Sequence, residues 1–371
     1  MRAIQRYVLV AVAAALWTST SLAADDTEAR ARAIHQRIFT IDTHSDIELS
    51  FATSEYMPGN FAEAQTTLDS MESGGLGGAF FIVYVGQAPR TPENYLKARA
   101  DALAKFDAIH RMTLLYPQRV GLATTAAEAR EIHASGKRVA LIGIENGFVM
   151  GKDLSVLADF RARGARYMTL VHNGHNDLGD SAQPRSELGD TGPAEHDGLS
   201  ALGEQVVAEL NRLGILVDVS HVSKQTMMEA TRLSKAPVIA SHSSVSGVFV
   251  HARNMDDEQL AVLKQNGGVI QLVAFNTYLK QGGGAAVSDL VDHIDYAVGK
   301  VGIDHVGISS DFGGGGGVSG WNNAGETFNV TLELVRRGYS EEDIAKIWSG
   351  NVLRIMEAAE KVAEQLGTPQ Q

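Results

Sequence analysis

The sequence predicts an α/β protein, a single-domain (β/α)8 barrel of the TIM type with additional helices at its C-terminal end. Three observations predict this fold. Short apolar runs alternate with helical patterns along most of the 371 residues, as they do in proteins built on a parallel sheet. The chain exceeds the roughly 250 residues that such a barrel needs. Histidine, aspartate and glutamate residues stand at the ends of several apolar runs, where barrels of this kind carry their functional residues.

Eight apolar runs are the predicted strands. They are short and rich in branched aliphatic residues, as expected of parallel strands that are buried on both faces. In chain order they cover residues 38–43, 79–85, 139–144, 165–171, 215–220, 237–241, 269–274 and 305–310. A doubly wound sheet is the weaker alternative, because no Gly-x-Gly-x-x-Gly motif opens a helix after the first run.

The predicted helices lie before, between and after these strands. Gly214 and Asn266-Gly267-Gly268 each follow a helical pattern, and glycine readily takes the left-handed conformation that ends a helix. The expected helices cover residues 25–37, 92–116, 199–213, 224–234, 256–265, 287–301, 327–337 and 341–366. The last two are the additional C-terminal helices. Four histidines within the helices are expected at the surface: His35, His110, His133 and His293.

Residues 1–23 have the pattern of a signal peptide. Basic residues at positions 2 and 6 precede an apolar stretch from Tyr7 to Trp17, and Ser21-Leu22-Ala23 then offers a cleavage site of small residues. The apolar stretch is shorter than the ~20 residues of a membrane-spanning helix, so an anchor is the weaker interpretation. We expect residues 24–371 to form one exported domain without a membrane anchor, periplasmic if the source is a Gram-negative bacterium.

Composition excludes several classes of protein. The chain has no cysteine, which rules out disulfides, a cysteine nucleophile and a cysteine-linked lipid anchor. Its formal net charge is −12, and an acidic protein without a basic patch is a poor nucleic-acid binder. We therefore expect no nucleic-acid partner.

Histidines and carboxylates stand at the ends of six apolar runs. They are His44, Asp46, Glu145, His172, His221, His242 and Asp311. Taken singly, each signal is weak, because a short His-x-Asp motif arises by chance and a lone buried histidine usually has a structural role. In a barrel, however, all these positions meet at one face. Histidine with carboxylate and no thiolate suits a hydrolytic zinc centre, so the set predicts a metal-dependent hydrolase.

The spacing suggests how these side chains share their work. His44 and Asp46 are two residues apart on one strand, so they point to the same side and can reach one metal. His221 and His242 follow neighbouring strands and can share a metal. Glu145 could cap a turn, or it could bridge two metals about 3.5–4 Å apart with its two oxygens. Asp311 could orient or deprotonate a water molecule.

The chain resembles the membrane (renal-type) dipeptidase family, peptidase family M19, within the amidohydrolase-like barrels. The resemblance rests on segments that occur in family order over nearly all of the chain after the signal peptide. These segments are residues 41–46, 143–147, 168–173, 218–223, 241–244, 252–254 and 307–312. Where many family members have Gly-His-Asn, this chain has Thr43-His44-Ser45, with the ligand positions intact.

The resemblance implies a zinc-dependent dipeptidase that hydrolyses the peptide bond of dipeptides with a metal-bridging hydroxide. It implies two zinc ions per subunit, one bound by His44 and Asp46, the other by His221 and His242, and both by Glu145. It also suggests a homodimer.

The resemblance further implies the residues that act on substrate and proton. Asp311 would handle the proton of the hydroxide, and His172 would polarise the scissile carbonyl and stabilise the oxyanion. Arg253 would hold the C-terminal carboxylate of the substrate, since its planar fork suits bidentate pairing.

Two other functions keep weaker support. A related binuclear-zinc amidohydrolase would act on N-acyl amino acids, β-lactams, lactones or other small amides. Many such enzymes use His-x-His on the first strand and a carbamylated lysine on the fourth, whereas residues 165–171 contain no lysine. A non-catalytic binding protein would be expected to lack some ligands. The glycine run 313–317 is interpreted as a flexible loop or as a mobile rim of the site.

Overall fold

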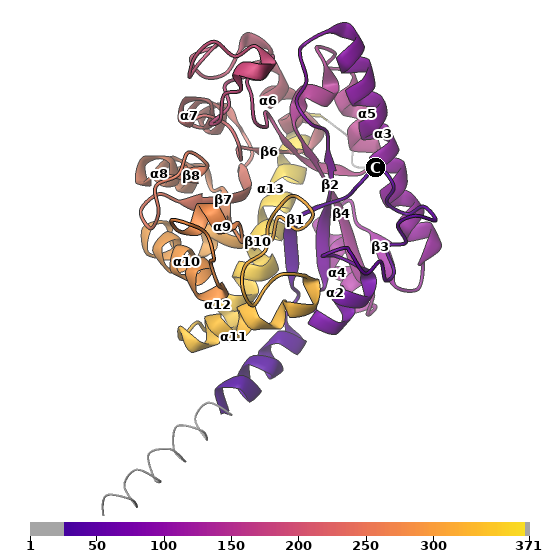
Figure 1. Ribbon diagram of the computed structural model, residues 1–371, viewed down its shortest axis with the longest axis vertical. Coiled ribbons are helices and arrows are strands. Elements are labelled where there is room, and N and C mark those ends of the chain that lie inside the picture. Colours follow the sequence, from indigo (N-terminus) through magenta and orange to yellow (C-terminus); the bar gives the residue numbers. More distant parts are fainter. Residues whose placement is uncertain (1–25, 368–371) are drawn as a thin grey trace, which may run out of the picture.

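The computed structural model describes residues 26–367 and confirms the predicted barrel (Figure 1). The signal-peptide prediction for residues 1–23 lies outside the described range. Eight parallel strands follow one another around the barrel, with helices between them. They are β1 (Ile41–Asp46), β2 (Gly78–Tyr84), β4 (Arg138–Glu145), β5 (Ala165–Thr169), β6 (Leu216–Asp218), β7 (Ile239–Val245), β9 (Val269–Val273) and β10 (Val306–Ser309).

The barrel closes between β10 and β1 at the C-terminal ends of these strands. The backbone N–H of Asp46 donates to the carbonyl oxygen of Phe312 at 2.7 Å, and that of Asp311 donates to the carbonyl oxygen of His44 at 3.1 Å. The Asp42 carboxylate accepts bonds from the backbone N–H and the hydroxyl of Ser310. These bonds bring three of the predicted site residues to one edge of the barrel.

The first strand begins later than the sequence predicted. The apolar run was placed at residues 38–43, but β1 covers Ile41–Asp46. The strand also ends later than predicted, because it continues through His44, which is fully buried inside the barrel although it is polar. Two short strands were also not predicted: β3 (Val120–Leu122) pairs with β4, and β8 (Asn254–Met255) pairs with β7.

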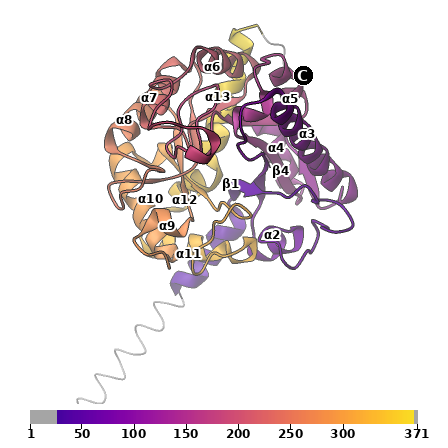
Figure 2. The ribbon, with the colours of Figure 1, turned by 45° about the horizontal axis from the view of Figure 1, so that its top comes forward.

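Helices surround the strands (Figure 2). Residues 26–37 are helical, and the later helices are α2 (Leu68–Gly74), α3 (Pro92–Leu115), α4 (Ala126–Ala134), α5 (Val156–Ala162), α6 (Ala201–Leu213), α7 (Lys224–Leu233), α8 (Asp257–Asn266), α9 (Asn276–Leu279), α10 (Val287–Val301), α11 (Phe328–Arg336), α12 (Glu341–Ala345) and α13 (Asn351–Gln365). The helix predicted over 341–366 is divided by a π-helical turn at Lys346–Gly350. The predicted C-terminal helices are therefore present, with one interruption.

Helix α13 closes the end of the barrel that is opposite the site. Its side chains Leu353, Ile355 and Met356 pack into the cluster that fills the barrel interior with Ile41 and Leu216. Arg354 donates to the carbonyl oxygens of Gly267 and Asp304, which precede β9 and β10. Because this end is sealed by an apolar helix, the opposite end is left for polar chemistry.

The prediction that four helical histidines lie at the surface was wrong for His35 and His293. His35 and His293 are buried, with exposed fractions of 8% and 0%, and His110 and His133 are half-buried. His35 bonds the hydroxyl of Thr331 and the carbonyl oxygen of Gly74. His293 accepts from the backbone N–H of Val245 and donates to a carbonyl oxygen of α9. These two histidines join helices to their neighbours, which helical periodicity does not reveal.

Within residues 26–367, no helix combines the length and the apolar character that crossing a bilayer requires.

Candidate metal centre and active site

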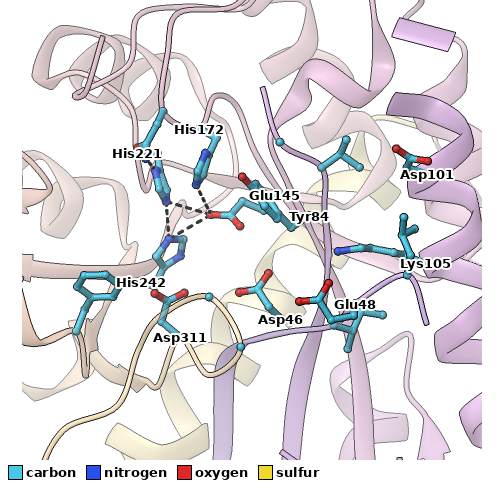
Figure 3. A pocket seen from close by; sticks show the side chains of 18 of the residues that line it. Asp46, Glu48, Tyr84, Asp101, Lys105, Glu145, His172, His221, His242 and Asp311 are labelled. Carbon is cyan, nitrogen blue, oxygen red and sulfur yellow. Dashed lines mark hydrogen bonds and ion pairs between the residues drawn. The ribbon is translucent and has the colours of Figure 1, made fainter. Parts of the chain in front are cut away.

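The predicted site residues meet at the C-terminal end of the barrel, around a pocket of about 460 Å³ (Figure 3). Those on its wall are Asp46, Glu145, His172, His221, His242 and Asp311. His44 lies beneath them and is fully buried. Arg253 is also buried, but it does not line this pocket.

Glu145 is shared by two groups of potential metal ligands. One group is His44, Asp46 and Glu145, and the other is Glu145, His221 and His242. Oε2 of Glu145 lies 3.5 Å from Nε2 of His44, while Oε1 lies 3.0 Å from Nε2 of His221 and 3.4 Å from Nε2 of His242. Each oxygen therefore faces a different group, which is the arrangement of a carboxylate that bridges two metals.

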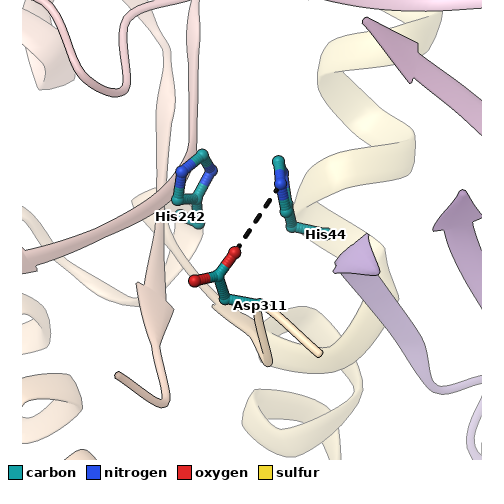
Figure 4. A group of neighbouring side chains, drawn as sticks. All are labelled: His44, His242 and Asp311. Carbon is teal, nitrogen blue, oxygen red and sulfur yellow. Dashed lines mark ion pairs between the residues drawn. The ribbon is translucent and has the colours of Figure 1, made fainter. Parts of the chain in front are cut away.

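Asp311 belongs to a third group, with His44 and His242 (Figure 4). Its Oδ1 lies 3.7 Å from Nε2 of His44. Asp311 follows β10 and faces both of the other ligand groups. It can therefore reach a proton or a cation that lies between these groups.

Buried atoms without partners show that the residues fit a metal. Among the described residues, Nε2 of His44 and Oδ1 of Asp46 are buried and have no hydrogen-bond partner. Buried polar atoms are rarely unsatisfied in native proteins. Both residues belong to one ligand group, in which Nε2 of His44 lies 3.4 Å from Oδ2 of Asp46, and a cation coordinated there would satisfy Nε2 of His44.

Hydrogen bonds on the far side of His44 prepare it as a ligand. The Tyr167 hydroxyl donates to the carbonyl oxygen of Thr43 and lies 3.0 Å from Nδ1 of His44. Because the hydroxyl has one proton, it accepts from the Nδ1–H of His44. Nε2 then carries the lone pair, as metal binding requires. The Tyr167 ring fits here because residue 143 is glycine: a Cβ at Gly143 would lie 2.2 Å from the ring.

The two histidines opposite are oriented in the same way. The Ser241 hydroxyl donates to Oδ2 of Asp218 at 2.6 Å and lies 2.8 Å from Nδ1 of His242. Oδ1 of Asn173 lies 3.2 Å from Nδ1 of His221 and accepts from it. Each Nε2 therefore presents a lone pair to the pocket, and partners of this kind orient metal-binding histidines in general.

The electrostatics of the pocket favour positive charge. Burial alone would raise the pKa of Glu145, but the neighbouring histidines, His44 and His172 most strongly, hold it well below its usual range. Burial raises the pKa of Asp311 well above its usual range, against the opposing effect of His44. Burial lowers the pKa of His172, which Glu145 partly offsets. Glu145 and Asp311 thus compete for the same cations or protons.

His172 and Arg253 lie on one side of the centre. Nε2 of His172 is 3.8 Å from Oε1 of Glu145, and its ring lies 4.1 Å from that of His221. Arg253 donates to the carbonyl oxygen of His242 at 3.1 Å, and its Nε has no partner among the described residues. Its guanidinium lies 5.5 Å from the ring of Tyr278, a wall residue. Arg253 therefore stands behind the wall that Tyr278 forms.

The glycine run 313–317 contributes to the pocket wall. A Cβ at Gly314 would lie 2.5 Å from Oδ2 of Asp46 and 2.7 Å from Oδ1 of Asp311. Only glycine lets the chain lie so close to both carboxylates. The backbone N–H of Gly316 donates to the carbonyl oxygen of Asp311. His221 and Asp311 themselves have positive φ, 65° and 58°, and backbone strain of this kind is common at functional sites.

Sequence reasoning missed several residues of the site. The hydrogen-bonding partners Asn173 and Asp218 lie inside the family-like segments and Tyr167 directly precedes one of them, but their role depends on which atoms face them. Other wall residues come from outside those segments: Glu48, Tyr84, Asp101, Lys105, Phe275 and Tyr278. Lys105 offered a signal, since it interrupts an otherwise apolar stripe on α3.

The barrel and its shared carboxylate define a class, the metal-dependent hydrolases that carry their ligands at the C-terminal ends of the strands. Residues 28–370 match the family described as membrane dipeptidase (Peptidase family M19). The chain therefore belongs to the M19 dipeptidases and is a peptide-bond hydrolase. The family assignment made from the sequence is confirmed.

Curated relatives and solved structures agree with this assignment. Dipeptidase aclJ of Aspergillus oryzae is 32% identical over 345 residues, which are 89% of this chain and 80% of that one. Dipeptidase tcpJ of Claviceps purpurea is 35% identical, covering 83% and 72%. The crystal structure of the probable dipeptidase PvdM from Pseudomonas aeruginosa has a TM-score of 0.88 at 32% identity, covering 91% and 100%.

A further structure is of a metallo peptidase from Rhodobacter sphaeroides, liganded with a phosphinate mimic of the dipeptide L-Ala-D-Ala. It has a TM-score of 0.76 at 25% identity and covers 87% of this chain and 99% of its own.

Proposed function

We propose that this protein is a zinc-dependent dipeptidase that uses two zinc ions to hydrolyse the peptide bond of dipeptides. One observation carries the proposal: the two oxygens of Glu145 face separate ligand groups on opposite sides. His44 and Asp46 would hold one ion, and His221 and His242 the other. Bound zinc would supply Lewis acidity and a water molecule acidic enough to be hydroxide near neutral pH.

The other site residues suit proton transfer and orientation. Asp311, whose pKa burial raises, is suited to take a proton from the attacking water and return it to the leaving amine. His172 borders the same centre and can donate a hydrogen bond to the oxygen of the scissile carbonyl as negative charge develops there. Arg253 is proposed to hold the C-terminal carboxylate of the substrate, which requires Tyr278 to give access to it.

The size of the pocket supports a small substrate. About 460 Å³ lies within the range of sites for small molecules. The relatives are named dipeptidases, and the Rhodobacter sphaeroides structure contains a mimic of a dipeptide. Dipeptides are therefore the first substrates to test.

A screen of L,L-, L,D- and D,D-dipeptides with zinc present tests the proposal. We expect hydrolysis of free dipeptides that stops after chelation and returns with zinc. The same dipeptides acetylated at the amine, and a β-lactam, test the alternative of a broader amidohydrolase. Hydrolysis of those compounds alone, with no dipeptide cleaved, would contradict the proposal.

We also propose that the protein is exported. The basic start, the apolar stretch and the small residues at 21–23 support this proposal. N-terminal sequencing of the protein from the periplasm of a Gram-negative host should give a chain that begins at Ala24. A chain that keeps Met1 in the cytoplasm would contradict it. A homodimer is proposed from the family resemblance alone, and sedimentation velocity would test it.

A further inference from the structure

Lys105 brings a buried positive charge to the wall of the active-site pocket. It lies on α3, on the helix face that also buries Ala98, Ala102, Ile109 and Met112. Its exposed fraction is 7%. Figure 3 shows its side chain extending from α3 into the pocket, on the side of the centre away from His221 and His242.

The ammonium group has no anionic partner. Among the described residues, no carboxylate lies within 4.0 Å of its Nζ, and no hydrogen bond to it is formed. The aromatic ring of Tyr84 lies nearby, with its centroid 5.7 Å from Nζ of Lys105. Burial lowers the pKa of Lys105, while Asp46 and Glu48 oppose this effect. The ammonium therefore lines the pocket without a salt bridge, and an anion that enters the pocket can pair with it.

Balancing the carboxylates of the centre does not explain this lysine. Asp46 and Glu145 belong to the proposed metal-ligand groups, and two divalent cations would neutralise them. Asp101 is paired with Lys97 at 2.5 Å. Among the lining residues, Lys105 is the one lysine or arginine. The charge is therefore available to whatever enters the pocket.

We propose that Lys105 determines substrate specificity by binding a carboxylate on the side chain of the first residue of the dipeptide. The proposal rests on the proposed function. The positions of the two cationic side chains locate the first residue of the dipeptide. Arg253 stands beside His242 and Tyr278, and Lys105 extends from the opposite wall. A dipeptide whose C-terminal carboxylate points to Arg253 directs its first residue towards Lys105. Glutamyl and aspartyl dipeptides then pair with the lysine.

The test compares Glu-Ala with Gln-Ala, which have the same shape and differ in charge. With zinc-loaded wild-type protein we expect kcat/KM for Glu-Ala to exceed that for Gln-Ala by about 10-fold or more, as for a hydrogen bond between charged groups. In Lys105→Met this preference should vanish, with Gln-Ala hydrolysed within about threefold of wild type. Lys105→Arg should retain most of the preference, because the charge is kept.

Controls separate a specific role from a structural one. Lys264→Met removes an exposed lysine from α8 and should leave the preference unchanged. Zinc content and the melting temperature of each variant show whether the site is intact. Equal loss for Glu-Ala and Gln-Ala in Lys105→Met, or a lysine-dependent preference for Ala-Glu over Ala-Gln instead, would overturn the proposal. If neither Glu-Ala nor any neutral dipeptide is hydrolysed by the zinc-loaded wild-type protein, it is the proposed function that fails.

Discussion

The two walls of the active-site pocket are organised differently. On the wall formed by β5, β6 and β7, His221 and His242 each have Nδ1 hydrogen-bonded to a neighbouring side chain, so their orientation is set by the protein. On the wall formed by β1 and α3, Oδ1 of Asp46 is buried without a hydrogen-bond partner, and Lys105 lines the pocket with no carboxylate within 4.0 Å of its Nζ among the described residues. The histidine wall is ordered by its own hydrogen bonds, whereas the carboxylate and lysine wall is the one that the proposed zinc ions and substrate would complete.

Glu145 lies between these two walls. His44 shows that the difference between them depends on the type of residue. His44 lies on the β1 side, yet it is fixed by Tyr167 in the manner of the opposite histidines. Histidine ligands need one tautomer and one ring orientation, which hydrogen bonds to Nδ1 provide. A carboxylate can use either oxygen, so Asp46 needs no such partner. The difference between the walls follows from the chemistry of the ligands.

Removing the shared carboxylate should have the largest effect. Glu145→Gln keeps the shape but loses the charge that both ligand groups share, so we expect zinc to be lost from both sites and kcat/KM to fall by about 1,000-fold or more. Glu48→Gln, on the same pocket but outside the ligand groups, should keep two zinc ions. Metal analysis and kinetics measure both. Full zinc occupancy in Glu145→Gln would show that the two ligand groups do not depend on a shared Glu145 carboxylate.

Changing Asp311 should separate metal binding from turnover. Asp311→Asn cannot carry a proton between water and amine, and we expect kcat to fall about 10²- to 10⁴-fold, as for loss of a general base, with zinc retained. Asp101→Asn, on the same pocket wall, is the matched control. A near-normal kcat would remove Asp311 from proton transfer, and loss of zinc would make it a ligand.

Paired changes behind the histidines compare the walls directly. Tyr167→Phe removes the acceptor for Nδ1 of His44, and Ser241→Ala removes the one for His242. Each should weaken zinc binding at its own site by about 10- to 100-fold and leave the other site unchanged, as measured by competition with a chelating dye. Tyr339→Phe, whose hydroxyl bonds Asp295, should change neither. Equal weakening at both sites in either variant would contradict independent walls.

The smallest expected effect is that of chelation on stability, apart from the loss of activity that chelation also causes. Ligands that bind only the folded state stabilise it by about 2.7 kcal/mol at 100 times their Kd, so zinc removal should lower the melting temperature by several degrees. The histidine wall should change least, because its hydrogen bonds do not need metal. Scanning calorimetry measures the shift, and NMR of the histidine rings shows which wall responds. An unchanged melting temperature would contradict zinc binding to the folded state.

Much of this architecture is predictable from the sequence because it depends on local patterns. Buried parallel strands are apolar runs, and the ligands stand at or near their ends, so the barrel and the positions of Glu145, His221 and His242 could be predicted together. The end of β1 could not be predicted, because the strand continues through His44, a polar residue that is buried in the barrel. The predicted surface position of His35 and His293 was wrong for a related reason, since each is buried against a carbonyl group of another element.

The roles of the residues around the ligands, such as Tyr167, depend on contacts between distant parts of the chain. No local sequence pattern encodes those contacts. Tyr167 acts on His44 from 123 residues away in the chain, and only the curvature of the barrel brings the two together. Lys105 is different: a lysine on the apolar stripe between Ala102 and Ile109 is a signal that helical periodicity could have detected. The pocket it enters, however, is formed by residues from other strands.

Zinc titration of the metal-free protein, followed by hydrolysis of a neutral dipeptide, tests the central claim most directly. If two ions share Glu145 and both are needed, activity should rise with added zinc and reach its plateau at two equivalents per chain. A plateau at one equivalent, or full activity without zinc, would contradict the account.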